Sequence, residues 1–224
     1  MNYLSVENIS KSYGERTLFE NISFGISKDQ KIAFIAKNGS GKTTIMSIIN
    51  GLDESDTGQV VLRKGIKMAF LSQNNNLQDE LTIEESIFAS DNETLKVIEA
   101  YEKALEHPED EETYQKAFDG MDRHNAWDFE TQYRQILFKL KLEDFHLKVK
   151  NISGGQQKRL SLAIILINRP DLLILDEPTN HLDLEMIEWL ETYFAKENIT
   201  LFMVTHDRFF LERVCNEIIE LDNG

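Results

Sequence analysis

The feature that most constrains this chain is a strand, a glycine-containing loop and a helix that follow one another between residues 31 and 50. The run KIAFIA has the β-branched and aromatic content of a buried strand, and TTIMSIIN has the pattern of a helix that ends before Gly51. The connecting loop reads KNGSGK. Such a loop points backbone N–H groups and a helix N-terminus at one anion, so the segment is predicted to hold a phosphate chain.

The polar groups of this loop fit a bound triphosphate. Gly39 and Gly41 allow backbone N–H groups to turn towards the β-phosphate. Lys42 brings a positive charge to the β- and γ-phosphate oxygens, and Thr43 offers a hydroxyl group to Mg²⁺. The phosphate-binding motif G-x-x-x-x-G-K-[ST] has its first glycine where this chain has Ala36. That change costs about 1 kcal/mol if φ is positive there and almost nothing if φ is negative. The candidate phosphate-binding residues are Asn38, Gly39, Ser40, Gly41, Lys42, Thr43 and Thr44.

A second predicted strand ends in two carboxylates. The run LLILDEP places Asp176 and Glu177 directly after four apolar residues. Two carboxylates at the end of a buried strand are costly unless a cation or another partner lies there. Neighbouring side chains of a strand point in opposite directions, so Asp176 is assigned to Mg²⁺ and Glu177 to the attacking water. The alternative is that both acids cap the turn at Pro178.

The rest of the pattern predicts an α/β layer that is interrupted by a helical insert. Apolar runs typical of buried strands occur before residue 73 and after residue 171, namely QVVLR, KMAFLS, LLILD, ITLFMVT and EIIELD. The segment between residues 76 and 131 holds 17 acids and 4 basic residues and has helical periodicity. Within it, Thr82 and Glu85 have capping-box spacing, and HPEDEE is expected to form the tip of a helical hairpin.

Composition excludes several classes of protein. The 39 acids and 24 basic residues give a formal net charge of -15, which argues against direct binding to a nucleic-acid backbone. Cys215 is the single cysteine and cannot form an internal disulfide, and no Cys/His cluster has zinc spacing. The longest apolar run is LAIILI, starting at Leu162, which is too short to span a bilayer. These features predict a cytoplasmic protein without a membrane segment.

The order of these motifs resembles that of the ATP-binding-cassette (ABC) ATPases, and the resemblance covers essentially the whole chain. Tyr13 in KSYG is similar to the aromatic residue that stacks on adenine, and AKNGSGKTT is similar to the Walker A loop. Gln73 in FLSQN resembles the Q-loop glutamine, and ISGGQ from Ile152 resembles the family signature. LLILDEP is similar to Walker B, NHLD to the D-loop, and His206 in VTHDR to the switch histidine.

The resemblance implies an ABC-type nucleotide-binding domain of the P-loop NTPase fold, with ATP and Mg²⁺ as cofactors. The implied catalytic residues are Lys42, Glu177 and His206. The implied metal site consists of Thr43, Gln73 and Asp176. The further residues implied to bind ATP are Tyr13, Gln73, Ser153, Gly154, Gly155 and Gln156. The last four would contact the γ-phosphate held by another cassette.

Three of these residues also have simpler interpretations. Tyrosines near strand ends often pack against the core, so Tyr13 could have only this structural role. Gln73 is either a turn residue or a link between Mg²⁺ and the helical insert. A single histidine such as His206 is often structural, but its position after the run ITLFMVT, at the same sheet edge as Asp176, favours a role in the site.

Two details resemble the ABC-F branch in particular, with the Uup-like members as the nearest. These are His181 in DEPTNHLD and the Asp, Arg and two aromatic residues that follow His206. The implied domains are the first part of the ATPase core at residues 1–73, a helical subdomain with a short acidic arm-like insert at 74–150, and the signature helix with the second part of the core at 151–224. Because ABC-F proteins usually carry two cassettes and this chain has one signature motif, we expect a fragment of a longer protein.

The resemblance implies that the cassette closes head to tail on a second cassette, in the full-length chain or in a homodimer, with ATP sandwiched between them and then hydrolysed. The resemblance to ABC-F implies a role in translation, with the ribosome as a partner. The main alternative is the ATPase subunit of an ABC transporter. A DNA-maintenance cassette is a third alternative, but such proteins generally carry zinc cysteines or a very long coiled-coil insert. A nucleotide sensor that does not hydrolyse ATP is a fourth, raised by Ala36.

Overall fold

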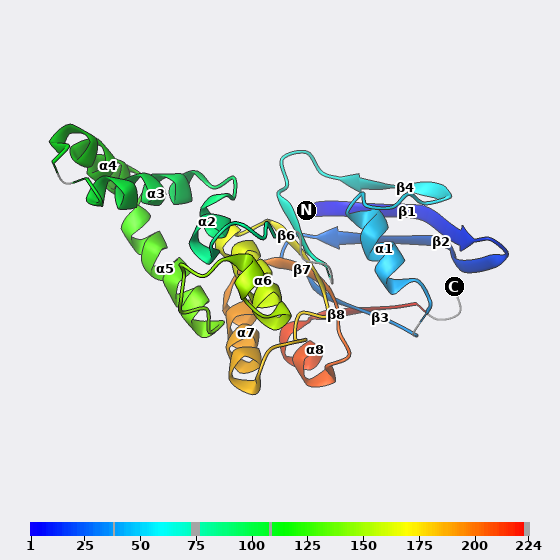
Figure 1. Ribbon diagram of the computed structural model, residues 1–224. Coiled ribbons are helices and arrows are strands. Elements are labelled where there is room, and N and C mark those ends of the chain that lie inside the picture. Colours follow the sequence, from blue (N-terminus) through cyan, green and yellow to red (C-terminus); the bar gives the residue numbers. More distant parts are fainter. Residues whose placement is uncertain (38, 73–76, 108, 222–224) are drawn as a thin grey trace. The chain divides into compact units, whose positions relative to one another are not determined.

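The computed structural model describes residues 1–37, 39–72, 77–107 and 109–221. The chain divides into two compact units (Figure 1). The sheet unit consists of Met1–Asn74 together with Pro170–Gly224, and the helical unit consists of Asn75–Arg169. The sequence division at residue 150 therefore differs from the structural boundary, because the signature helix packs on other helices of the helical unit.

The sheet unit contains a parallel sheet of five strands in the order β5-β6-β7-β3-β8. Every neighbouring pair in this sheet is parallel, so the carboxyl ends of its strands lie at one edge. All residues of β6 and β7 are buried, which explains why these segments read as continuous apolar runs. The strands are β3 (Lys31–Ala36), β5 (Met68–Leu71), β6 (Leu172–Asp176), β7 (Thr200–Val204) and β8 (Glu217–Leu221).

A second sheet of three antiparallel strands has the order β2-β1-β4. Its strands are β1 (Asn2–Tyr13), β2 (Arg16–Ser27) and β4 (Thr57–Leu62). The sequence analysis predicted β4 but not the hairpin of β1 and β2. Register shifts interrupt the pairing of β1 with β2, so neither strand has the clean alternation of apolar and polar residues that identifies a strand.

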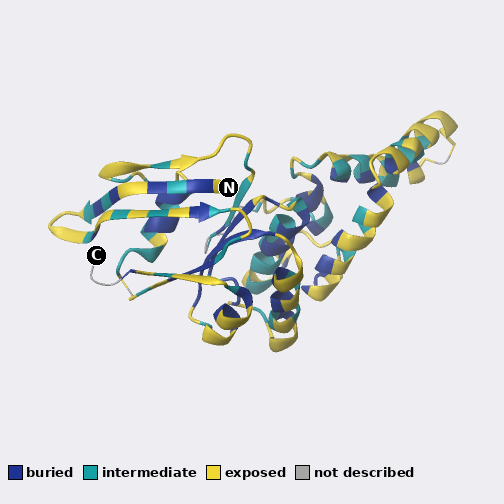
Figure 2. Ribbon diagram, turned by 180° about the vertical axis from the view of Figure 1, so that it is seen from behind, coloured by how far each residue is buried: buried dark blue, intermediate teal, exposed yellow. Residues whose placement is uncertain are grey.

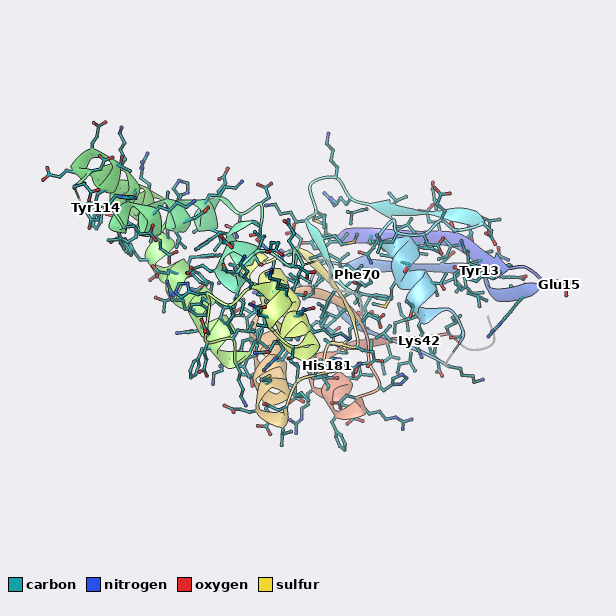
Figure 3. The ribbon with its side chains drawn as sticks, viewed as in Figure 1. Tyr13, Glu15, Lys42, Phe70, Tyr114 and His181 are labelled. Atoms are coloured by element: carbon teal, nitrogen blue, oxygen red, sulfur yellow. The ribbon has the colours of Figure 1, made fainter. Side chains whose placement is uncertain are left out.

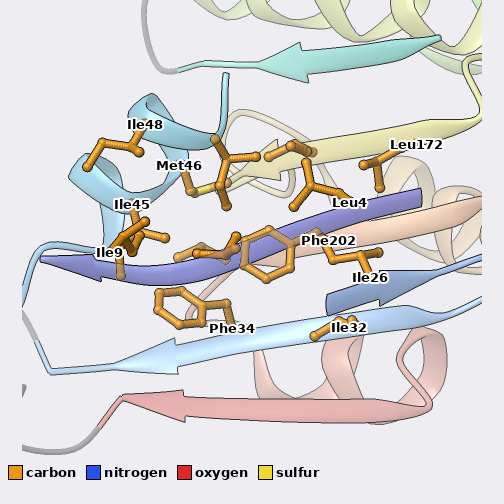
Figure 4. Packing of buried hydrophobic residues seen from close by; sticks show 14 of the residues in the cluster. Leu4, Ile9, Ile26, Ile32, Phe34, Ile45, Met46, Ile48, Leu172 and Phe202 are labelled. Carbon is orange, nitrogen blue, oxygen red and sulfur yellow. The ribbon is translucent and has the colours of Figure 1, made fainter. Parts of the chain in front are cut away.

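The core of the sheet unit joins the two sheets and α1 (Lys42–Ile49). Figure 4 shows side chains of α1 and β1 packed against those of the parallel sheet. The rings of Phe34 and Phe202 lie 5.5 Å apart between centroids, on the adjacent strands β3 and β7. Two further helices of this unit, α7 (Leu184–Lys196) and α8 (Arg208–Val214), pack on each other.

The helical unit contains five α-helices in its described residues and a short 3-10 helix, η1 (Val149–Asn151). The α-helices are α2 (Ile83–Phe88), α3 (Glu93–Leu105), α4 (Glu111–Arg123), α5 (Ala126–Lys139) and α6 (Gly154–Asn168). The predicted capping box at Thr82 and Glu85 is confirmed at the start of α2. The predicted hairpin is also confirmed, since α3 packs against α4. Figure 2 shows that α4 is largely exposed, and Met121 is its one buried residue.

None of the helices in the described ranges combines the length and apolar character that a bilayer crossing requires.

Candidate functional site

A cavity of about 700 Å³ lies where β3, β6 and β7 end. Its volume is in the range of small-molecule sites. The sequence-predicted residues that line it are Tyr13, Gly39, Gly41, Lys42, Thr43, Thr44, Asp176, Glu177 and His206. Asn38 and Gln73 lie outside the described residues. Asn180, the first residue of the predicted D-loop, also lines the cavity. The lining residues to which the sequence analysis gave no role in the site are Leu18, Thr179, Val204, Thr205 and Asp207. The last three surround the predicted His206, and this adjacency was the signal that could have found them.

The glycines of the loop before α1 adopt conformations that other residues rarely adopt. Gly39 has φ +77° and Gly41 has φ +96°. A Cβ atom at Gly41 would lie 3.0 Å from Cδ1 of Phe19, which is fully buried. Ala36, in contrast, is the last residue of β3, pairs with Leu221 and is not among the residues with positive φ. Of the two alternatives for Ala36, the structure therefore supports the nearly silent one.

The start of α1 is open to an anion. Gly41 is its N-cap and provides no side-chain cap, and the first turn holds no acidic residue. The ammonium group of Lys42 donates a hydrogen bond to the carbonyl of Ala36, 2.7 Å away, and so lies across the loop. Arg16, which sequence reasoning missed, supports the loop by donating to the carbonyl of Gly39 at 2.9 Å. The helix dipole, the Lys42 charge and the N–H groups of the loop together favour a phosphate chain here.

The two carboxylates after β6 have different surroundings. Asp176 is 6% exposed, and its Oδ2 atom is shielded from solvent. Glu177 has φ +52°, and its N–H group donates to the carbonyl of Val204 at 2.8 Å. A positive φ in a residue other than glycine is uncommon and carries a conformational cost. The chain thus leaves strand geometry at Glu177, and both carboxylates line the cavity.

Glu177 and His206 form a pair across the ends of β6 and β7. The distance from Glu177 Oε1 to His206 Nε2 is 3.4 Å, and the backbone N–H of His206 donates to Glu177 Oε2 at 3.3 Å. The Glu177 side chain is only 11% exposed, whereas that of His206 is 68% exposed. The glutamate thus lies largely buried in the cavity, in contact with His206, whereas the imidazole is accessible to a ligand.

The predicted signature residues belong to the helical unit and begin α6. The Ser153 hydroxyl accepts a hydrogen bond from the N–H of Gln156 at 3.2 Å, and the Gln156 side chain accepts one from the N–H of Ser153 at 2.9 Å. Ser153 and Gly154 are exposed, and a Cβ atom at Gly154 would meet nothing within 4 Å. This exposed helix start, with a hydroxyl group as its N-cap, has the chemistry of an anion site.

The cavity fits a nucleotide with its metal better than a metal alone. Among the described residues, no group of three or more His, Cys, Asp and Glu side chains is suited to hold an ion. The Thr43 hydroxyl and the Asp176 carboxylate both line the cavity. Mg²⁺ in nucleotide sites characteristically takes one or two protein oxygens and completes its shell with phosphates and water. A set of two oxygen donors beside a phosphate-binding loop is therefore suited to the Mg²⁺ complex of a triphosphate.

Comparisons with known proteins agree with this geometry. The protein-family model described as ABC transporter matches residues 19–180. The uncharacterized ABC transporter ATP-binding protein YfmR of Bacillus subtilis is 42% identical, with 100% of this chain and 37% of that protein aligned. ABC transporter F family member 2 of Arabidopsis thaliana is 37% identical over 98% of this chain and 34% of its own length.

A third relative is the energy-dependent translational throttle protein EttA of Escherichia coli, which is 32% identical over 94% of this chain and 39% of its own length. The chain thus spans between 34% and 39% of these three relatives. A solved ATP-binding subunit of an ABC transporter has a TM-score of 0.70 at 23% identity, with 99% of this chain and 87% of that chain covered. A dimeric ATP-binding cassette in a post-hydrolysis state, bound to ADP and Pi, has a TM-score of 0.67 at 25% identity, with coverage of 99% and 95%.

Proposed function

We propose that this chain is an ATP-hydrolysing cassette of an ABC-F protein that acts on ribosomes in the cytoplasm. The premise is that the chain belongs to the ABC transporter family. The observation that carries the proposal is the cavity in which the phosphate-binding loop meets Asp176 and the pair of Glu177 and His206. A binding module without catalysis has no need of a glutamate that is held by a histidine beside the phosphate site.

Each polar residue of the cavity has a separate role in the proposed reaction. Lys42 and the start of α1 would bind the β- and γ-phosphates, and Thr43 and Asp176, which line the cavity, would hold Mg²⁺. When bound, Mg²⁺ neutralises charge on the phosphate oxygens. Glu177 orients and polarises the attacking water, and His206 contacts the γ-phosphate. Phosphoryl transfer to water needs little beyond this alignment and charge stabilisation, which is what fixed side chains in a cavity supply.

The complete site requires a second cassette. The four signature residues place the Ser153 hydroxyl group and the backbone N–H groups of the first helical turn at the N-terminus of α6. We infer that they contact the γ-phosphate on a second cassette, supplied by the longer protein or by another copy. The dimeric, ADP- and Pi-bound cassette among the similar structures supports pairing with a second cassette.

The proposal of a role in translation is supported by the relatives. One is named an energy-dependent translational throttle protein and another an ABC transporter F family member. The acidic segment between residues 76 and 131 disfavours direct contact with RNA phosphates, so a basic ribosomal protein is the more suitable contact for it. The alternative, a transporter subunit, is distinguished by finding the protein on membranes instead of ribosomes.

The test of the nucleotide site is the affinity for MgATP. Replacing Lys42 with Ala removes a charge-assisted interaction worth roughly 1.5–3 kcal/mol, so MgATP is expected to bind about 10- to 100-fold more weakly. Lys64→Ala is the matched control, because Lys64 is exposed and does not line the cavity. Equal MgATP affinity in the two variants, measured by calorimetry, would remove the phosphate-binding assignment. Sedimentation of the Glu177→Gln variant with ribosomes in the presence of ATP then tests the partner.

A further inference from the structure

Two aspartates of the loop between α1 and β4 form hydrogen bonds with the end of β1. The backbone N–H of Asp56 donates to the carbonyl of Ser10 at 2.8 Å, and its carboxylate accepts from the N–H of Ser12 at 2.7 Å. The loop is also tied to the preceding helix, since the N–H of Leu52 donates to the carbonyl of Ser47 at 2.9 Å. The end of β1 is thus anchored to the helix whose first residues line the phosphate site.

The second aspartate of this loop holds side chains instead of backbone. Asp53 Oδ2 accepts a hydrogen bond from the Tyr13 hydroxyl at 2.9 Å, and Asp53 Oδ1 lies 2.9 Å from the Lys11 ammonium. Lys11 also donates to the backbone carbonyl of Glu54, and its ammonium lies 5.4 Å from the centroid of the Tyr13 ring. The hydrogen bond from Lys11 lowers the pKa of Asp53, and the same bond raises the pKa of Lys11. Both groups are therefore charged at neutral pH.

These contacts determine where the Tyr13 ring lies. Tyr13 is 55% exposed and is the last residue of β1, so little packing restricts its side chain. It nevertheless lines the same cavity as Lys42. Both residues are labelled in Figure 3. The Lys11 side chain is only 11% exposed, so its surroundings restrict the movement of the ion pair whose carboxylate binds the tyrosine hydroxyl. The ring is held at its hydroxyl end by Asp53 and has the Lys11 ammonium over one face, so an aromatic ligand would stack on the opposite face.

We propose that Asp53, supported by Lys11, is a positioning residue that fixes Tyr13 as the stacking platform for the purine base of the triphosphate. The inference rests on the proposed function, because it concerns the base of the nucleotide whose phosphates occupy the loop at Lys42. It also joins base recognition to phosphate recognition, because α1 begins at the phosphate loop and the segment after it carries Asp53. A ring that is ordered before binding saves the cost of ordering it when the base arrives.

The test compares two ligands of the same chain, MgATP and Mg²⁺ tripolyphosphate, of which only the first carries a base. Asp53→Ala and Tyr13→Phe each release the ring from the carboxylate, and each is expected to weaken MgATP binding about 2- to 10-fold. Tripolyphosphate affinity is expected to stay unchanged in both. The double variant is expected to lose no more MgATP affinity than either single variant, because both changes break one contact. Glu54→Ala is the matched control, since Glu54 contributes only its backbone carbonyl to Lys11.

Asp53→Asn provides a rescue, because its amide oxygen still accepts from the Tyr13 hydroxyl. Its MgATP affinity is expected to lie closer to wild type than that of Asp53→Ala. If Asp53→Ala fails to fold, Tyr13→Phe alone decides, because it leaves the ion pair with Lys11 intact. Unchanged MgATP affinity in Tyr13→Phe, or equal losses for both ligands, would overturn the positioning role while the phosphate site stands. A wild-type chain that binds neither ligand would overturn the proposed function and this inference with it.

Discussion

Replacing Gly41 with Ala tests the geometry of the phosphate loop most sharply. Its φ of +96° costs an alanine roughly 1–2 kcal/mol. The added Cβ atom would also lie 3.0 and 3.1 Å from two ring atoms of Phe19 and 3.3 Å from Cβ of Leu18. Phe19 is fully buried and cannot move aside without disturbing the core, so overpacking adds about 1–3 kcal/mol. The free energy of unfolding is expected to fall by about 2–5 kcal/mol in total.

Gly65→Ala is the matched control for this experiment. Gly65 has φ +88°, but a Cβ atom there meets nothing within 4 Å, so only the conformational cost of roughly 1–2 kcal/mol applies. Urea denaturation followed by circular dichroism measures both variants, and calorimetry measures their MgATP affinity. We expect Gly41→Ala alone to lose MgATP binding, because displacing Gly41 moves the start of α1. Equal destabilisation in the two variants would refute the contact between Gly41 and Phe19.

Two further predictions concern titratable groups away from the cavity. Burial and the nearby charge of Glu84 raise the pKa of Glu102 to about 7, despite the Arg134 guanidinium 2.7 Å away. Between about pH 4.5 and 7 the folded state holds a proton that the unfolded state has released, so the free energy of unfolding falls as the pH rises through this range. Glu102→Gln is expected to remove this loss, which urea denaturation at pH 5 and pH 8 measures. Burial raises the pKa of the Cys215 thiol to about 12, so Ellman's reagent at pH 8 should modify it far more slowly in the folded than in the unfolded chain; equal rates would contradict that burial.

The sequence predicted the elements whose signals are local. The α/β fold class and the resemblance to ABC ATPases are confirmed by the family match and by the similar solved structures. The strand, loop and helix around Lys42 are specified within one short segment, as is the capping box at Thr82. Buried parallel strands such as β6 read directly as apolar runs, because both of their faces are covered.

What the sequence did not predict depends on contacts between distant segments. The hairpin of β1 and β2 has an irregular register, so its alternation is hidden. Arg16 donates a hydrogen bond to the carbonyl of Gly39, and Asp53 accepts one from Tyr13. No residue spacing in the sequence predicts either contact. The positive φ of Glu177 likewise departs from the strand geometry from which its direction was argued. The helical unit extends to Arg169 because α6 packs on α2 and α5, a tertiary preference that the motif order does not encode.

The most direct test of the central claim is phosphate release by the Glu177→Gln variant, measured in a preparation whose MgATP binding has been verified. The change keeps the shape of the side chain and its reach to His206 but removes the charge that polarises water. We expect MgATP affinity near that of wild type and turnover reduced by about 100-fold or more. Hydrolysis at the wild-type rate would contradict the account, because the carboxylate in the cavity would then take no part in the reaction.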